Sequence, residues 1–389
     1  MRSVELFAGA GGLAIGISKA GFQHEAVVEW DTDACNTIRK NQERGIEPVL
    51  NWPLFSTDVR KFNFSNIPEG IDLLAGGPPC QPFSLAGKHK GHKDERNMFP
   101  EVIRAIREIK PKVVLIENVK GILRQSFSKY FEYILLQINY PEIIRKKQED
   151  WLTHLSRLEK YHTQGRHVGL NYRVIFRLLN AADYGVPQKR ERVIIVGFRS
   201  DIKIEWSFPL QTHSHDSMLW DQWITGEYWD RHKVAKRNRP PFPEKLKNKI
   251  NKLKSFDFLL GKAWVTVRDA ISDLPKESSK TDNHFFIPGA RVYPGHTGSP
   301  FDEPAKTLKA GDHGVPGGEN MLAYPDGKVR YFTIRESARL QTFPDEYYFP
   351  GSWTEAMRQL GNAVPVKLGQ IIAENLKEGL LNFSGAQAR

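Results

Sequence analysis

The stretch that decides the fold is Ser3-Val4-Glu5-Leu6-Phe7-Ala8-Gly9-Ala10-Gly11-Gly12, close to the start of the chain. Ser3–Phe7 is predicted to form a strand, and the glycine-rich turn leads into an amphipathic run that ends at Gly21. Such a turn lets the backbone approach a ligand closely, with the N–H groups of the following helix pointing at it. Because glycine-rich strand-to-helix turns are common, packing alone explains this one equally well.

Strands and helices are predicted to alternate over the first 200 residues. Apolar runs bounded by turn residues indicate further strands at Glu25–Glu29, Ile71–Ala75, Lys112–Ile116 and Arg192–Phe198. Helical spacing covers Thr32–Asn41 and Met98–Ile109, and the charged run Pro141–His162 is interpreted as an exposed helical insertion. This pattern predicts an α/β domain with a doubly wound, mostly parallel sheet, whose ligands bind at the carboxyl ends of the strands.

The composition changes after residue 200, where the alternation stops and aromatic, glycine and proline residues become frequent. Arg231–Lys254 holds ten Lys and Arg residues against one acid, Glu244. Regular patterning returns after Phe332, and Val366–Leu380 is predicted to form a terminal helix. We therefore expect a catalytic and cofactor-binding domain over 1–200, a smaller loop-rich recognition domain over 201–350, and a return to the first domain over 351–389.

Composition narrows the class of protein. The 389 residues include 56 Lys and Arg against 45 Asp and Glu, a net charge of +11, which favours a polyanionic partner. The two cysteines, Cys35 and Cys80, exclude a disulfide scaffold and a zinc site made of cysteines alone. No apolar run approaches the ~20 residues that span a bilayer, and the N-terminus lacks a signal-peptide pattern. We expect a soluble cytoplasmic protein without membrane contact.

The most specific motif is Gly76-Gly77-Pro78-Pro79-Cys80-Gln81-Pro82-Phe83-Ser84, which directly follows a predicted strand. The two prolines remove backbone donors and stiffen the approach to Cys80. A cysteine is a nucleophile only as the thiolate, which needs an electropositive or hydrogen-bonded setting. A buried inert thiol is the usual alternative, and it suits Cys35 on its helical stretch better than Cys80.

Polar residues also end the neighbouring strands. Glu29 ends the second strand about 20 residues after the glycine-rich turn, where an acid meets ribose hydroxyls in nucleotide sites. Asp58 follows another possible strand, and Glu117-Asn118-Val119 closes the strand next to Cys80. Taken singly, each carboxylate is more often a cap or a solvated turn residue, and a run such as Gln188–Arg192 is more often a solvated charge run.

The ordered set of motifs resembles the cytosine-5 DNA methyltransferase family over Ser3–Asp201 and Phe332–Leu380. The matching motifs are Phe7–Gly12, Glu29–Asp31, Thr57–Val59, Pro78–Gln81, Glu117–Val119, Gln188–Arg192, Arg335–Pro344 and Gly361–Pro365. The resemblance implies S-adenosylmethionine as methyl donor, S-adenosylhomocysteine as product, and no metal. The implied cofactor residues are Phe7, Ala8, Gly9, Gly11, Gly12, Glu29, Trp30, Asp58, Val59, Gly76, Pro78, Met98, Asn362, Ala363 and Val364. Met98 stands where the family often has leucine.

The resemblance also implies a mechanism on a cytosine flipped out of duplex DNA. Cys80 attacks C6, which makes C5 nucleophilic toward the methyl group, and the product forms by loss of the C5 proton and elimination of Cys80. Glu117 is implied at N3 and the exocyclic amine, Arg192 at the base O2, and Arg190 in support of the nucleophile loop.

The implied partner is double-stranded DNA, read by the segment between Arg192 and Arg335. The candidate DNA-contacting residues are Gln81, Ser84, Arg291, Lys306, Thr307, Lys309 and His313. Arg231–Lys254 is a candidate phosphate-binding surface, and a solvated face explains it about equally well. By analogy with the family we expect a monomer from a bacterial restriction-modification system, with a companion endonuclease that acts on the same sequence.

Three other functions compete with this one. An RNA cytosine-5 methyltransferase of the two-cysteine class needs a second catalytic cysteine, and the tRNA-directed branch usually carries a Cys-Phe-Thr tripeptide; neither is found here. A catalytically dead homologue is disfavoured because every mapped catalytic position is intact. Amino-methylating enzymes use an Asp/Ser/Asn-Pro-Pro-aromatic loop, which Pro78-Pro79-Cys80-Gln81 does not match.

Overall fold

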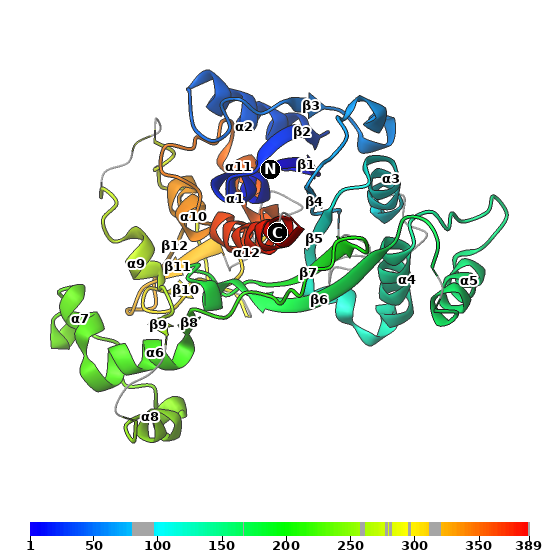
Figure 1. Cartoon of the computed structure of the whole chain (residues 1–389). Coiled ribbons are helices and arrows are strands. Elements are labelled where there is room, and N and C mark those ends of the chain that lie inside the picture. Colours follow the sequence, from blue (N-terminus) through cyan, green and yellow to red (C-terminus); the bar gives the residue numbers. More distant parts are fainter. Residues whose placement is uncertain are drawn as a thin grey trace. The chain divides into compact units, whose positions relative to one another are not determined.

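The computed structural model describes residues 1–79, 97–165, 167–256, 261–276, 279, 282–294, 297–310 and 320–387. The chain divides into two compact units, which we describe separately. The first comprises Met1–Leu179, Glu191–Phe208 and Gly369–Arg389, and the second comprises Asn180–Arg190 and Pro209–Leu368. Figure 1 follows both units along the chain.

A seven-stranded sheet organises the first unit, in the order β3-β2-β1-β4-β5-β7-β6. The strands are β1 (Arg2–Leu6), β2 (Gln23–Glu29), β3 (Leu54–Ser56), β4 (Leu73–Gly76), β5 (Val113–Val119), β6 (Tyr172–Asn180) and β7 (Glu191–Arg199). The first five strands pair in parallel, and β7 runs antiparallel to β5. The helices are α1 (Gly12–Lys19), α2 (Thr32–Glu43), α3 (Phe99–Ile109), α4 (Ser128–Asn139), α5 (Trp151–Thr163) and α12 (Val366–Gln387).

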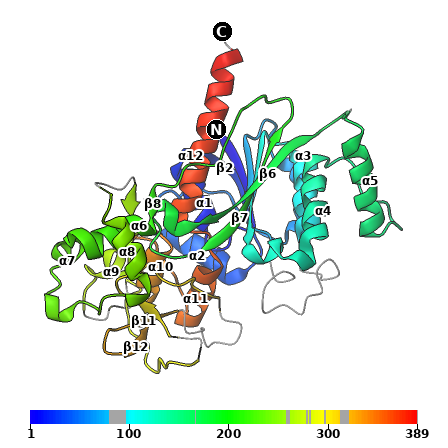
Figure 2. The same ribbon diagram turned by 90° about the horizontal axis from the view of Figure 1, so that it is seen from below.

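Helices cover both faces of this sheet. Alternate strand residues such as Leu6 and Val114 pack with Ile106 of α3 and Ile134 of α4 in one apolar core. Figures 1 and 2 show α1 and α12 on the other face, and a Cβ at Gly369 of α12 would lie 3.0 Å from the side chain of Leu13 in α1. The expected doubly wound, mostly parallel α/β fold is confirmed.

Two elements differ from the sequence-based prediction. Strand β6 was not predicted, because it lies at the edge of the sheet and its central residues, Phe176 among them, are exposed rather than continuously apolar. The expected helix over 141–162 begins only at Trp151, where Asp150 caps α5 by accepting hydrogen bonds from Leu152 N and Thr153 N. Residues 141–150 form turns and irregular backbone.

The second unit consists of short elements. It has β8 (His213–Ser214) with β9 (Lys262–Ala263), and β10 (Ser299–Pro300), β11 (Met321–Ala323) and β12 (Val329–Tyr331) in a second small sheet. Its helices are α6 (His215–Trp220), α7 (Glu227–Arg231), α8 (Lys247–Leu253), α9 (Val267–Ile271), α10 (Ile334–Leu340) and α11 (Trp353–Asn362). Capping boxes begin α9, at Thr266, and α10, at Thr333. Local caps therefore stabilise helices that are too short to persist alone.

The packing units are not the functional domains expected from the sequence. Contacts place 180–190 and 351–368 with the second unit, whereas the expected boundaries fall at residues 200 and 350. Because packing alone defines these units, the division by function stays a prediction. Within the described part of the chain, the helices are all too short or too polar to cross a membrane.

The buried His24 gives the fold a dependence on pH. Its Nδ1 lies 3.0 Å from the Ser3 hydroxyl and its Nε2 lies 3.0 Å from the Ala14 carbonyl oxygen, a pairing that suits the neutral ring. Burial lowers the pKa of His24 from 6.5 to about 4. Because the folded pKa lies below the unfolded one, the unfolded chain binds the proton more readily. The contribution of neutral His24 to the free energy of unfolding is therefore fully present above pH 6.5 and is lost as the pH drops toward 4.

We expect the free energy of unfolding contributed by His24 to fall by about 2 kcal/mol between about pH 7.5 and about pH 5. Urea denaturation at the two pH values measures the change. His24→Gln removes the titrating ring and keeps a donor for the Ala14 carbonyl, so its stability should depend less on pH by that amount. An equal pH dependence in both proteins would contradict this account.

Candidate active site

Four parallel strands, β2, β1, β4 and β5, bring their carboxyl ends to one edge of the sheet in the first unit. The pairs are Leu6 with Val28, Leu6 with Gly76, and Gly76 with Ile116. Phe7, Glu29 and Glu117 each come one residue after these pairs. The register therefore brings the glycine-rich turn, the acid of β2 and the acid of β5 to the same carboxyl edge, where α/β sheets bind ligands.

The glycine-rich turn depends on left-handed backbone. Phe7, Gly9 and Gly11 have φ angles of 58°, 54° and 86°. Nothing lies within 4 Å of a Cβ built at Gly9, so its conformation rather than crowding requires glycine. Gly11 is the N-cap residue of α1 and supplies no side-chain cap, and the first turn of α1 has no acidic residue. The N-terminal end of α1 thus offers backbone N–H groups that no capping side chain occupies.

Glu29 is fixed by the turn that it faces. Its two carboxylate oxygens accept hydrogen bonds from the backbone N–H groups of Gly9 at 2.7 Å, Trp30 at 2.8 Å and Asp31 at 2.7 Å. Burial raises the pKa of this carboxyl, and the three backbone bonds oppose the rise. The next residue, Trp30, is 69% exposed. The chain therefore presents an oriented carboxylate and an open aromatic face side by side in sequence.

Asp58 and Val59 follow β3. Asp58 caps a short 3₁₀ turn by accepting a hydrogen bond from Arg60 N, and its carboxylate binds the Arg60 side chain at 2.5 and 3.0 Å. This guanidinium lowers the pKa of Asp58. Val59 is buried in the core, and Met98, at the start of α3, packs against the same core.

The segment that leads to Cys80 is held by close packing and by one side chain. A Cβ at Gly76 would lie 2.6 Å from the Leu6 carbonyl oxygen, and one at Gly77 would lie 3.1 Å from Glu117 Oε2. The amide nitrogen of the buried Asn118 donates to the Pro78 carbonyl at 3.2 Å. Asn118 therefore anchors the chain two residues before Cys80. The sequence placed Asn118 in a motif but indicated no such role.

Glu117 and Arg192 form an ion pair at this edge. Arg192 Nε lies 2.6 Å from Glu117 Oε1, and both side chains are about nine-tenths buried. Arg192 Nη1 donates to its neighbour, the Glu191 carbonyl, at 2.8 Å. Since β5 and β7 are paired strands, each residue is held by the sheet itself. The pair presents a carboxylate beside Gly77, with a guanidinium bound to it.

Arg190 is the buried centre of a hydrogen-bond network in the second unit. Its guanidinium donates to the carbonyls of Leu308 at 3.0 Å, Gly361 at 2.7 Å and Ala363 at 2.8 Å. The buried Gln188 accepts from Leu308 N and donates to Leu340 O. These contacts join chain segments more than 100 residues apart, which no local sequence pattern reveals. The support that Arg190 was expected to give the nucleophile loop stays a prediction.

The remaining candidates of the second unit are placed as follows. Asn362 is exposed at the end of α11, Ala363 is half-buried and Val364 is buried. Arg291 and Lys309 are exposed, whereas Lys306 and Thr307 are half-buried and donate to Thr297 Oγ1 and Lys189 O, both at 2.7 Å. Cys80, Gln81, Ser84 and His313 lie outside the described residues.

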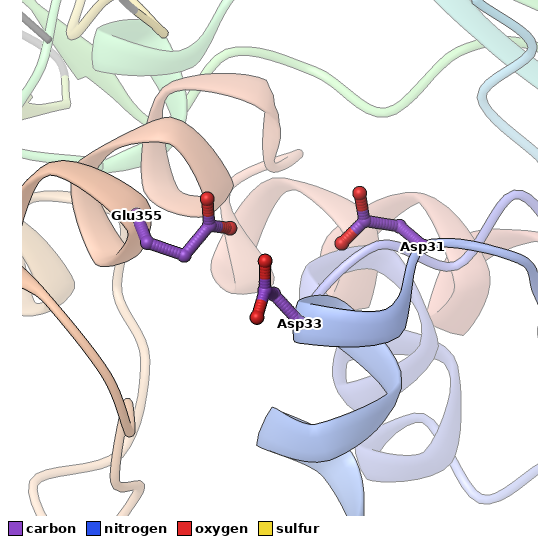
Figure 3. A group of neighbouring side chains, drawn as sticks. All are labelled: Asp31, Asp33 and Glu355. Atoms are coloured by element: carbon purple, nitrogen blue, oxygen red, sulfur yellow. The ribbon is translucent and has the colours of Figure 1, made fainter.

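Three carboxylates resemble a cation site in composition but serve their own helices. Figure 3 shows Asp31 and Asp33 at the start of α2 and Glu355 on α11. Asp31 caps α2 by accepting from Ala34 N at 2.9 Å. Glu355 binds Arg358, one turn along its own helix, at 2.6 Å. Asp33 is the acidic residue in the first turn of α2, where a carboxylate favours the helix dipole. Helix capping, the helix dipole and an intrahelical pair thus account for the three residues, and we give them a structural role.

Comparison with known proteins identifies relatives along nearly the whole chain. The family model for "C-5 cytosine-specific DNA methylase" matches residues 1–140 and 154–378. Type II methyltransferase M.Eco47II of Escherichia coli is 33% identical over 377 residues, which are 96% of this chain and 78% of that protein. Type II methyltransferase M.PspPI of a Psychrobacter species is 34% identical over 95% of this chain and 77% of its own length.

The fold has matching solved structures. The S. pombe Dnmt2 methyltransferase superposes with a TM-score of 0.56 at 18% identity, covering 98% of this chain and 99% of the other. The unmatched interval in the family model, 141–153, coincides with the irregular segment before α5 and its first residues. That interval is therefore an insertion relative to the family model.

Arg190 offers a direct test of the network in the second unit. Arg190→Met nearly keeps the side-chain volume but removes the donor to the carbonyls of Leu308, Gly361 and Ala363, the first two of them buried, and we expect a loss of about 3 kcal/mol or more in the free energy of unfolding. Urea denaturation measures it. The matched control is Lys189→Met, which removes the exposed pair with Glu303 and a cation–π contact with Trp264 at 5.8 Å, and should cost less than about 1 kcal/mol. Equal losses in both variants would contradict the assigned role.

Proposed function

This chain belongs to the C-5 cytosine-specific DNA methylase family, and we propose that it transfers a methyl group to C5 of a flipped-out cytosine through a covalent adduct with Cys80. The enzyme is a DNA cytosine-5 methyltransferase, and DNA is its substrate. The observation that carries the proposed chemistry is the Glu117–Arg192 ion pair beside Gly77, three residues before Cys80.

The described residues suit a donor of the S-adenosylmethionine type, which supplies an activated methyl group when bound. Glu29 has a fixed carboxylate whose remaining lone pairs are able to accept from ribose hydroxyls. Trp30 is exposed and offers its ring to the adenine, and Phe7 directly follows β1 at the same carboxyl edge of the sheet. Gly9, Gly11 and the uncapped start of α1 offer backbone to the methionine part. The proposed site also includes Ala8, Gly12, Asp58, Val59, Gly76, Pro78, Met98, Asn362, Ala363 and Val364.

The protein's own groups carry the covalent steps in this proposal. The Cys80 thiolate forms a bond to C6, and the electrons of the C5–C6 double bond shift so that C5 becomes nucleophilic. Glu117 holds the N3 and exocyclic amine side of the ring, which stabilises the adduct. After C5 is methylated, its proton leaves to a base and the Cys80–C6 bond breaks, which restores the aromatic ring and the thiolate.

Arg192 has two tasks in this scheme. Its Nε holds Glu117, and its Nη2 donates no hydrogen bond to a described residue, so a donor remains for the O2 of the base. Flipping the cytosine costs a few kcal/mol, which phosphate contacts must offset. Gln81, Ser84, Arg291, Lys306, Thr307, Lys309 and His313 are the proposed DNA contacts.

We also propose a restriction-modification setting, in which a monomer protects DNA from a companion endonuclease of the same specificity. The support is that the relatives from E. coli and Psychrobacter are Type II methyltransferases.

Cys80→Ser is expected to abolish methyl transfer and leave donor binding intact, because a hydroxyl is a far weaker nucleophile than a thiolate. Bisulfite sequencing of plasmid DNA from expressing cells should show protected cytosines in one short motif, absent with Cys80→Ser. Calorimetric binding of S-adenosylhomocysteine should be unchanged in the variant. Cys35→Ser, a buried thiol on α2, is the matched control and should keep the protection. Normal turnover by Cys80→Ser would exclude the covalent mechanism.

Arg192→Ala is expected to lower kcat by about 100-fold while the Kd for DNA changes little, since its contacts act on the reacting base. Single-turnover methylation and DNA titration separate the two quantities. The control is Arg199→Ala at the other end of β7, where the arginine pairs with the exposed Asp201. A loss in DNA affinity alone would instead make Arg192 a phosphate contact.

A further inference from the structure

The second unit contains a small helical lobe with its own core, which we define as residues 215–256 and call the α6–α8 lobe. Met218 and Leu219 of α6 pack with Ile250 and Leu253 of α8, and Trp220 and Trp223 cover them. Trp229 of α7 is buried and donates from Nε1 to the Gln222 carbonyl at 2.6 Å. Both views of the chain show α6 next to α8 (Figures 1 and 2). The lobe is therefore an ordered scaffold for whatever its surface carries.

The surface of this lobe is strongly cationic. Residues 231–254 contain ten Lys and Arg side chains and a single acid, Glu244. Four of the ten have carboxylate partners: Arg231, Arg239, Lys247 and Lys249. The other six make no ion pair with any residue that the structure describes, and all are exposed: Lys233, Lys236, Arg237, Lys245, Lys252 and Lys254. Nearby acids therefore pair with four of the ten cations, and six positive charges have no ion pair among the described residues.

The backbone that carries these cations is ordered. Lys236 and Arg237 lie in a 3₁₀ turn closed by hydrogen bonds from Asn238 N to Ala235 O and from Arg239 N to Lys236 O. Lys245 lies in the 3₁₀ turn Glu244–Leu246, and Lys252 lies in α8, whose Ile250 and Leu253 are buried in the core. Fixed cations of one sign repel one another unless a polyanion neutralises them. A solvated face normally intersperses both signs.

We propose that the α6–α8 lobe binds the phosphate backbone of duplex DNA outside the recognised sequence, independently of base identity. This inference rests on the proposed function, which already requires DNA as substrate. Charge complementarity selects phosphates, since the exposed cations outnumber the exposed acids and no base-reading pattern is needed for backbone contacts. The contact would hold the enzyme on DNA before and after it meets its target.

The test is the salt dependence of binding by the full-length protein to a random-sequence duplex. Two triple variants each remove three charges from the lobe: K233Q/K236Q/R237Q and K245Q/K252Q/K254Q. The matched control K19Q/K110Q/K203Q also removes three exposed cations that have no ion pair among the described residues. They lie at the ends of α1 and α3 and after β7, at the sheet edge opposite the glycine-rich turn. Fluorescence anisotropy gives Kd between about 50 and 200 mM KCl.

Each lobe variant should reduce the slope of log Kd against log salt by about 2 to 3, which is close to 0.9 for each phosphate that the variant no longer neutralises, and the control by less than about 0.5. Equal changes in lobe variants and control would show a solvated face and overturn the proposal, as would unchanged slopes throughout. Methylation of genomic DNA at low salt is measured in parallel. If the parent protein methylates DNA and the slopes do not separate, only the lobe assignment fails. If it does not methylate DNA, the proposed function fails, whatever the slopes show.

Discussion

The close approach of β4 to β1 is the constraint on which the rest of the site depends. A Cβ at Gly76 would lie 2.6 Å from the Leu6 carbonyl oxygen, so only glycine lets the two strands end side by side. That meeting point brings the glycine-rich turn to the segment before Cys80. Glu117, one residue beyond the partner of Gly76 on β5, then falls at the same edge. The chemistry is thus placed by a steric requirement of the backbone.

Much of this could be predicted from the sequence, because the strands of a parallel sheet are local apolar runs followed by turns. Glu29 and the Glu117–Val119 motif are predicted at strand ends from the sequence; β2 ends at Glu29, whereas β5 continues two residues past Glu117 to Val119. The expected α/β fold and family follow from motifs of this local kind. Strand β6 was not predicted, because an edge strand with exposed central residues lacks the continuous apolar run by which buried strands are identified in a sequence.

What could not be predicted is contact between distant segments. Arg190 meets the carbonyls of Gly361 and Ala363, about 170 residues further along the chain. Asn118 binds Pro78 across neighbouring strands. Hydrogen bonds to backbone carbonyls leave no signature in the accepting residue, so such partners become visible only in three dimensions. The ion pairs of the α6–α8 lobe are likewise visible only in three dimensions, and they show which of its cations have a carboxylate partner.

The insertion before α5 makes this enzyme easy to equip with a reporter. Residues 145–148 are exposed, and the backbone on either side is held by the bonds of Arg157 to Glu149 and to the Ile144 carbonyl. Lengthening an exposed loop adds little entropic cost, because the closure penalty grows only with the logarithm of its length. A fluorescent or affinity peptide grafted between Lys146 and Gln148 would thus sit outside the sheet. It would leave both chain ends untouched and let single enzyme molecules be followed on DNA.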